Sequence, residues 1–442
     1  MKLKNVAILN TSNSISLENN KGFKIFVENS EKKNDINNLS FNGNISKKRK
    51  LKKIENIKMI FLFLYFIIII LVENLYRNPL FNKSLNIQEK IKGNKTKNDS
   101  FYLFWKIISA FGGEKIIIPL YLIFFLFFPL NISFFILMII IYNSFFIGLF
   151  KMIYKEKRPY WESETLDIVC NKQYGNPSGH SMMSTCLYLS LSHILCNYFS
   201  CLKKNKFIKV FIFVTFSILT ILIMISRFIL TAHSFNQILY GFTLGLGFYF
   251  LFIHIYSFHT YNALEFLKLI FNIKIVIIFT IINLIFLFIC AIAYFSIKED
   301  EEFINEMYKK VFNGVRCKIP KKYLAFKNGG LNQSLLITAL IGAHFGLKLL
   351  EILLRNYNYN IDKYINEFNQ SSIKRWFIRL CILIFSLIGI GFYFAIPNNS
   401  NLYVIYIFKS NLAYFLCLFG LHSVGIFLSI HLNVANENIS KI

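Results

Sequence analysis

Long apolar runs, separated by short polar connectors, constrain the fold of this chain more than any other feature. A run of about 20 apolar residues is long enough to cross a lipid bilayer as a helix. Runs of this length, or somewhat shorter, lie near residues 59–72, 115–130, 131–150, 181–200, 207–226, 237–256, 274–296, 332–354, 376–396 and 404–432. The sequence therefore predicts an all-α, polytopic membrane bundle of about ten transmembrane helices, because a helix satisfies its own backbone hydrogen bonds within the bilayer.

The composition agrees with a membrane protein and argues against a nucleic-acid partner. With 55% hydrophobic and 16% charged residues, the chain is too apolar for a typical soluble protein. The formal net charge of +26 would suggest nucleic-acid binding in a soluble protein. Here Lys and Arg gather in short segments between the apolar runs, where basic residues set the membrane topology. We therefore expect no nucleic-acid partner.

Basic residues also indicate how the chain is oriented in the membrane. A basic run at residues 47–53 directly precedes the first apolar run, which places the N-terminus in the cytosol. The loops then expected on the opposite face are 75–114, 151–180, 227–236 and 298–331. The Lys-rich connector 201–209 falls on the cytosolic face, as the positive-inside rule requires.

Three short polar motifs lie at boundaries of the apolar runs, and this topology places all three on the extracytosolic face. Their main residues are Lys151 and Arg158 in the first motif, Asn176 to His180 in the second, and Arg227, His233 and Gln237 in the third. Carboxylates such as Glu156 and Glu162 are a minority beside them. The excess of cations indicates an anion site, and phosphate is its natural ligand because guanidinium groups bind tetrahedral oxyanions in bidentate fashion.

The second motif adds backbone donors and a histidine to this site. Ser178 and Gly179 precede a helix expected to begin near residue 181, so its free N–H groups and positive end would face the same anion. Two histidines beside a phosphate suggest that one attacks phosphorus and forms a phosphohistidine, while the other donates a proton to the leaving oxygen. Gln237 lies four residues after His233, on the same face of a helix beginning there, where its carbonyl oxygen would orient the imidazole.

Taken together, these residues resemble the superfamily that joins type 2 phosphatidic acid phosphatases, glucose-6-phosphatases and vanadium haloperoxidases. Its signature is Lys, six residues, Arg-Pro; then Pro-Ser-Gly-His; then Ser-Arg, five residues, His, three residues, Asp. The chain matches each position at the family spacing except the last, where Gln237 replaces Asp. The resemblance covers residues 100–256.

The resemblance implies a role for each matched residue. His233 would be the nucleophile and His180 the general acid, with Arg227 and Gln237 completing the catalytic set. The implied substrate-binding residues are Lys151, Arg158, Ser178 and Gly179. It also implies a six-helix phosphatase core with its site at the extracytosolic surface. Because cationic side chains would stabilise the phosphoryl group, we expect neither a metal nor another cofactor.

The substrate stays open between three interpretations. We favour a phosphorylated lipid narrowly, because lipid phosphates are the commoner substrates in this superfamily. Gln237, the Tyr160-Trp161 pair and the additional helices are similar to glucose-6-phosphatases, which makes a sugar phosphate the alternative. Gln at this position also resembles dolichyl-diphosphate phosphatases. A non-catalytic phospholipid-binding or transport protein is the third interpretation.

These expectations divide the chain into four parts and suggest a location. The parts are a polar, basic and disordered cytosolic tail at 1–57, a signal-anchor helix with a lumenal loop at 58–100, the phosphatase core at 101–260, and additional transmembrane helices at 261–442. We expect the endoplasmic reticulum or another endomembrane with the site facing the lumen, and the plasma membrane as the alternative. The sequence does not indicate an oligomeric state.

Other features concern packing rather than chemistry. Cys170 and Cys317 lie in polar loops on one predicted side of the membrane, so a disulfide between them is feasible. Gly241 and Gly245 form a small-xxx-small pattern that predicts close helix packing. The histidines expected to serve packing or the membrane interface are His193, His254, His259, His344, His422 and His431.

Overall fold

The computed structural model describes most of the chain. The described residues are 22–93, 99–166, 170–199, 202, 204–259, 269–312, 317, 325–357, 410–428 and 430–431. The chain divides into two compact units, Met1–Phe63 and Leu64–Ile442. The contacts discussed below all lie within the second unit.

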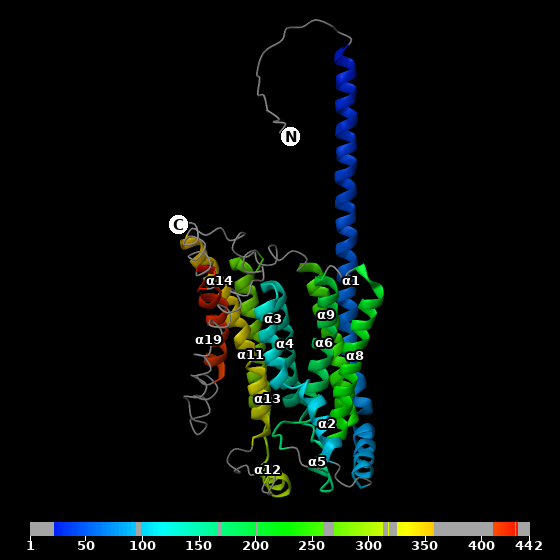
Figure 1. Ribbon diagram of the computed structural model, residues 1–442, viewed down its shortest axis with the longest axis vertical. Coiled ribbons are helices and arrows are strands. Elements are labelled where there is room, and N and C mark those ends of the chain that lie inside the picture. Colours follow the sequence, from blue (N-terminus) through cyan, green and yellow to red (C-terminus); the bar gives the residue numbers. More distant parts are fainter. Residues whose placement is uncertain are drawn as a thin grey trace, which may run out of the picture. The chain divides into compact units, whose positions relative to one another are not determined.

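Every regular element among the described residues is helical, which confirms the predicted all-α fold class. The elements are α1 (Gly22–Gly93), α2 (Asp99–Ala110), α3 (Glu114–Phe127), α4 (Leu130–Tyr154), α5 (Pro159–Glu162), α6 (Gly179–Tyr198), α8 (Lys206–Ile229), α9 (Phe235–His259), α11 (Ile273–Ser296), α12 (Glu301–Met307), the π-helical turn η1 (Tyr308–Phe312), α13 (Phe326–Ser334), α14 (Ile337–Asn356), α19 (Ala413–Gly420) and the π-helical turn η4 (Leu421–Gly425) (Figure 1). Residues 22–57 of the predicted polar tail belong to α1, and residues 1–21 lie outside those described.

Seven helices among the described residues are long and apolar enough to cross a membrane. An eighth span results if α2 and α3, bent by 43° at the break between them, count as one. The predicted run at 181–200 forms α6, which carries buried Ser and Thr side chains and is not among the seven. The predicted run at 376–396 lies outside the described residues. These helices make the chain an integral membrane protein.

Helix α1 continues well beyond its apolar run. We expected a loop at residues 75–114, but α1 extends to Gly93 and α2 follows it after a short break. The polar side chains of Glu73, Ser84 and Gln88 are buried, and they recur at intervals close to a whole number of helical turns. The protein therefore covers a polar face of this helix, where the sequence alone predicted a loop.

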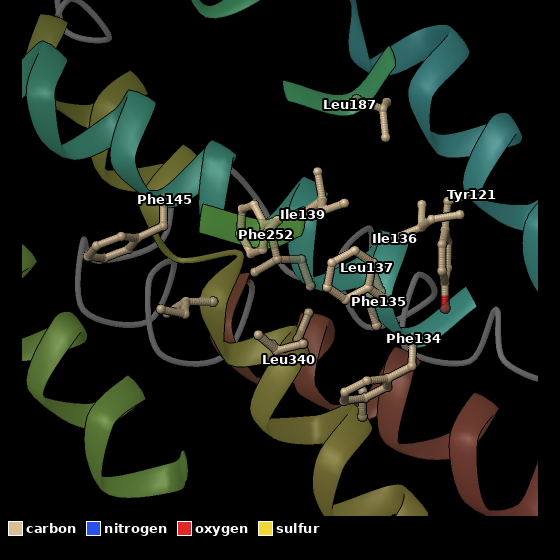
Figure 2. Packing of buried hydrophobic residues seen from close by; sticks show 14 of the residues in the cluster. Tyr121, Phe134, Phe135, Ile136, Leu137, Ile139, Phe145, Leu187, Phe252 and Leu340 are labelled. Atoms are coloured by element: carbon tan, nitrogen blue, oxygen red, sulfur yellow. The ribbon is translucent and has the colours of Figure 1, made fainter. Parts of the chain in front are cut away.

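Helix α4 forms the centre of the hydrophobic core. Most of its side chains are buried, and Figure 2 shows part of the surrounding cluster. Phe135 of α4 packs edge-on against Phe252 of α9, with ring centroids 6.1 Å apart. On another side, Phe134 contacts the rings of His344 and His422 at 6.1 and 6.0 Å. These two histidines therefore serve packing, as predicted.

Helix α6 is enclosed by α4, α8 and α9. A Cβ on Gly241 of α9 would lie 2.6 Å from the carbonyl oxygen of Ser178, and one on Gly245 would lie 2.7 Å from that of Met182. Neither position leaves room for a side chain, so the two backbones approach closely. The predicted close packing at these glycines is confirmed, and it holds α9 against the start of α6.

A smaller aromatic cluster holds the loops at one end of the second unit. Trp161 of α5 packs against Phe326 of α13 with ring centroids 4.8 Å apart, and Phe312 joins the same cluster. Figure 1 shows α5 and α12 together at this end. Cys170 and Cys317 form the disulfide that the sequence made feasible, with 5.6 Å between their Cα atoms. Aromatic packing and the disulfide together therefore hold the loop that leads into the second motif.

Candidate active site

The end of α4 places the first motif. Lys151 lies in the last turn of this helix and is 4% exposed. The helix ends at Lys155, which adopts a left-handed conformation (φ 50°, ψ 25°) and donates its N–H to the carbonyl of Lys151 at 3.2 Å. The chain turns at this point, and Arg158 is only 1% exposed.

A tight turn between α8 and α9 places the third motif. Thr231 in this turn has a φ of 56°. The N–H groups of Ala232 and His233 both donate to the carbonyl of Arg227, at 3.1 and 3.3 Å. His233 is consequently buried just before α9 begins, one helical turn ahead of Gln237.

Three contacts join the motifs, although they are far apart in the sequence. The Arg158 guanidinium donates from Nη1 to Nε2 of His233 at 3.2 Å. The backbone N–H of Ser178 donates to the carbonyl of Gln237 at 2.9 Å. Lys151 Nζ lies 3.7 Å from the point that a Cβ on Gly179 would occupy. The structure thus brings the three motifs into one buried site.

The cations of this site are bound by neutral groups. Lys151 Nζ donates to Oε1 of Gln173 at 2.6 Å, and Arg158 Nε donates to the backbone carbonyl of the same glutamine at 2.7 Å. Arg227 Nη1 donates to Oγ of Ser109 at 2.6 Å, while its Nε is buried without a hydrogen-bond partner. Within the described part of the chain, no carboxylate forms an ion pair with any of the three. The three cations therefore lie together without a directly paired carboxylate, an arrangement that favours binding of an anion.

The hydrogen bonds around His233 assign its tautomer. Gln237 Nε2 donates to Oε1 of Glu156 at 3.0 Å and to the carbonyl of Lys157 at 2.8 Å, and both of these groups are acceptors. The Gln237 side-chain oxygen therefore faces His233, where it lies 3.0 Å from Nδ1. Nδ1 then carries the proton, and the lone pair resides on Nε2, which accepts from Arg158.

The protonation state of His233 suits a nucleophile. Burial lowers the pKa of His233 well below its usual value of 6.5, and the charges of Arg158, Arg227 and Lys151 lower it further. The hydrogen bond with Gln237 acts in the opposite direction. His233 is therefore neutral near pH 7, and neutral imidazole keeps the lone pair needed for nucleophilic attack.

His180 lies at the start of α6, beside the break between α2 and α3. A Cβ on Gly112 would lie 2.8 Å from Ile223 and 3.2 Å from His180, and one on Gly113 would lie 3.3 Å from Nε2 of His180. Glycines at this break therefore make the room that the imidazole occupies. All eight site residues predicted from the sequence lie in or directly beside this one region.

Three further residues take part in the site, although none of them is a signature position of its motifs. Glu156 stands out in the sequence only as one of few carboxylates near Arg158. Gln173 contacts both Lys151 and Arg158, and Ser109 contacts Arg227. No spacing or periodicity marks Gln173 or Ser109, because their partners are brought near them only by folding.

Comparison with known proteins agrees with the motifs. The sequence model of the PAP2 superfamily matches residues 132–261, which contain all three motifs, so this region is similar to that superfamily. The chain is similar to phosphatidylglycerophosphatase B of Bacillus subtilis (strain 168), with 32% identity over 84 residues, which are 19% of this chain and 40% of the relative. The match thus spans less than half of that relative's length.

A similar chain is also found among solved structures. It is described as the crystal structure of the first transmembrane PAP2 type phosphatidylglycerolphosphate phosphatase from Bacillus subtilis. The two chains share 20% sequence identity and a TM-score of 0.40, over 45% of this chain and 98% of that one.

Proposed function

We propose that this protein is a membrane phosphatase that hydrolyses a phosphate ester through a phosphohistidine on His233, with no requirement for a metal ion. One observation carries the proposal. Nε2 of His233 holds a lone pair, lies 3.2 Å from the Arg158 guanidinium, and belongs to a neutral imidazole oriented by Gln237. A phosphate bound to Arg158 would lie against the atom that attacks it.

The proposed reaction has two steps. The substrate phosphate binds Lys151, Arg158 and Arg227, and its negative charge favours a proton on His180, whose pKa burial and these cations otherwise hold well below 6.5. Nε2 of His233 then attacks phosphorus, and the bond from phosphorus to the ester oxygen breaks while the protonated His180 donates its proton to that oxygen. His180, now neutral, then takes a proton from water, whose oxygen attacks phosphorus, and the bond from phosphorus to Nε2 of His233 breaks. Inorganic phosphate leaves, and both histidines return to their starting states.

A phosphorylated lipid is the substrate class that the surroundings favour. Helix α2 contacts the site through Ser109, yet Leu103, Phe104 and Ile107 on the same helix are 58%, 50% and 53% exposed. The face of α2 opposite Ser109 is therefore apolar and exposed, so a helix of the site borders the region where acyl chains would lie. The similarity to a bacterial phosphatidylglycerophosphatase supports the same class. We place the site at the lumenal or external membrane face, on the charge pattern of the connectors.

A substrate panel on purified membranes tests this proposal. Phosphate release is measured from phosphatidate, phosphatidylglycerophosphate, a sphingoid phosphate, dolichyl diphosphate and glucose 6-phosphate, in excess EDTA. We expect release from at least one lipid, inhibition by vanadate, and loss of activity in His233→Ala but not in the control His254→Ala. Exclusive release from glucose 6-phosphate would establish the sugar-phosphate alternative. No vanadate-sensitive release from any substrate would leave the non-catalytic interpretation.

A further inference from the structure

The chain departs from the superfamily signature at Gln237, whose side-chain oxygen accepts from Nδ1 of the proposed nucleophile His233. A neutral amide stabilises a positively charged imidazole less than a carboxylate does. In this structure a carboxylate is nevertheless present one hydrogen bond further away, because Gln237 Nε2 donates to Oε1 of Glu156 at 3.0 Å. The side chain of Glu156 is only 11% exposed. We propose that Glu156 is a positioning residue that orients Gln237 and supplies the negative charge that the motif lacks.

The first part of this role is to fix which way the Gln237 amide points. If the amide were reversed, its oxygen would face the carboxylate of Glu156 and the carbonyl of Lys157, and its NH2 group would face His233. Two repelling acceptor pairs exclude that orientation. Asn236 Nδ2 also donates to Oε1 of Glu156 at 2.7 Å, which holds the carboxylate in place.

The loop of the second motif is built around this arrangement. The N–H of Gly175 donates to the backbone carbonyl of Glu156 at 2.7 Å. A Cβ at this position would lie 2.7 Å from Cδ of Gln237, so only glycine lets the loop lie against the amide. The backbone of this loop therefore packs directly against the Gln237 amide.

Helix α1 supports Glu156 from outside the region that the family model matches. Arg77 Nε lies 4.0 Å from Oε2 of Glu156 and donates to Oε1 of Glu73 at 2.8 Å. Glu73 is fully buried and accepts from Nδ2 of Asn176, the residue before Pro177, at 2.7 Å. The Arg77 guanidinium also lies over the ring of Tyr154, 4.4 Å from its centroid. Glu73, Glu156 and Arg77 together therefore carry a net negative charge.

This charge matters at the stage when His233 changes charge. The neutral imidazole becomes a cationic phosphoimidazolium when Nε2 bonds to phosphorus, while Nδ1 keeps its proton. An amide does not pass a proton on, so Glu156 acts by orientation and by electrostatic attraction through the polarised Gln237 amide. The inference rests on the proposed function, since it assigns a means of stabilising the intermediate of that reaction.

The experiment compares Glu156→Gln with Glu162→Gln in the full-length protein. Glu162 is a matched control because it lies in the same segment but pairs with Lys157 at the surface, at 2.8 Å. We expect Glu156→Gln to lower kcat about 10-fold or more, with KM and the vanadate inhibition constant changed less than about threefold. Glu162→Gln should retain wild-type kinetics. A Glu156→Gln protein that is folded and has wild-type kcat would overturn the proposal.

A second pair of variants separates positioning from a merely structural role. Gln237→Asp places a carboxylate next to Glu156, and we expect it to lose activity through repulsion between the two. Adding Glu156→Gln to Gln237→Asp should raise kcat above that of Gln237→Asp alone. If the two substitutions caused independent structural defects, the double variant would instead have a lower kcat than either single variant. A double variant less active than Gln237→Asp would contradict the proposal.

A third readout does not depend on turnover, so failure of the proposed function is distinguishable from failure of this inference. Diethylpyrocarbonate modifies the lone pair of a neutral imidazole, and peptide mass spectrometry follows its rate at His233. We expect this rate to fall several-fold in Glu156→Gln, because the released amide lets the proton move to Nε2, and to stay unchanged in Glu162→Gln. Equal rates of His233 modification in both variants would contradict the positioning role, even if the protein showed no phosphatase activity.

Discussion

The guanidinium of Arg158 and the imidazole of His233 are in direct hydrogen-bond contact, with 3.2 Å between Nη1 and Nε2. A cation suited to binding phosphate therefore touches the nitrogen suited to attacking it. The guanidinium of Arg158 also donates from Nε to the carbonyl of Gln173 at 2.7 Å and from Nη1 to the carbonyl of Ala232 at 3.0 Å. A phosphate bound to this guanidinium would lie beside Nε2 of His233, the nucleophile that we propose.

Replacing Arg158 by lysine tests how far this geometry matters. A lysine keeps the charge but loses the planar fork and the hydrogen bonds to two carbonyls. We expect Arg158→Lys to lower kcat/KM by about 100-fold or more, measured by phosphate release. The control is Arg355→Lys, at an exposed arginine that pairs with Glu351 at 2.6 Å and should leave kcat/KM unchanged. Full activity of Arg158→Lys would contradict the assignment.

The lowered pKa of His233 predicts the pH dependence of its reactivity. Burial and three neighbouring cations disfavour the protonated form, so protonation requires a pH well below the usual 6.5. The rate at which diethylpyrocarbonate modifies His233 should therefore remain constant as the pH falls through 6.5. A histidine in a free peptide should lose half of its reactivity near that pH. A midpoint for His233 at or above 6.5 would show that the imidazole is not held neutral.

Ser109 is predicted to affect binding of the phosphate more than the chemical step. Its hydroxyl accepts from Nη1 of Arg227 at 2.6 Å, and Nε of the same guanidinium already has no partner. Ser109→Ala should raise KM and the vanadate inhibition constant about 3- to 10-fold, because the guanidinium becomes less ordered. Ser217→Ala on α8, where the exposed hydroxyl bonds only the carbonyl of Phe213, serves as the matched control. A change in kcat with constant KM would argue against this role.

Two glycine substitutions should change stability in opposite directions. A Cβ on Gly245 would lie 2.7 Å from the carbonyl oxygen of Met182, so Gly245→Ala should lower the free energy of unfolding by about 1–3 kcal/mol. Among the described residues, no atom lies within 4 Å of the Cβ position of Gly420, which has helical dihedral angles, so Gly420→Ala should raise stability by about 0.5–1 kcal/mol. Thermal unfolding of the two variants in the same detergent checks both signs, and equal shifts would show that the tight contact between α6 and α9 is not needed.

Much of the fold follows from the sequence because the bilayer imposes helices on long apolar runs. The runs at 207–226 and 274–296 correspond closely to α8 and α11. Residues 75–93 were predicted to form a loop and are helical instead. Polar side chains at helical spacing look like a solvated segment when the protein surface that covers them is unknown.

The sequence by itself determined the class of fold and the chemical groups of the site. Apolar run length selects membrane helices, and the cations and histidines at their ends indicate an anion site. Only the tertiary structure decided which other groups form hydrogen bonds with the motif residues: Glu156 with Gln237, Glu73 with Asn176, and Ser109 with Arg227. These partners are 81, 103 and 118 positions apart in the chain. Hydrogen bonds over such separations depend on how helices pack, and they leave no spacing in the sequence by which they could be predicted.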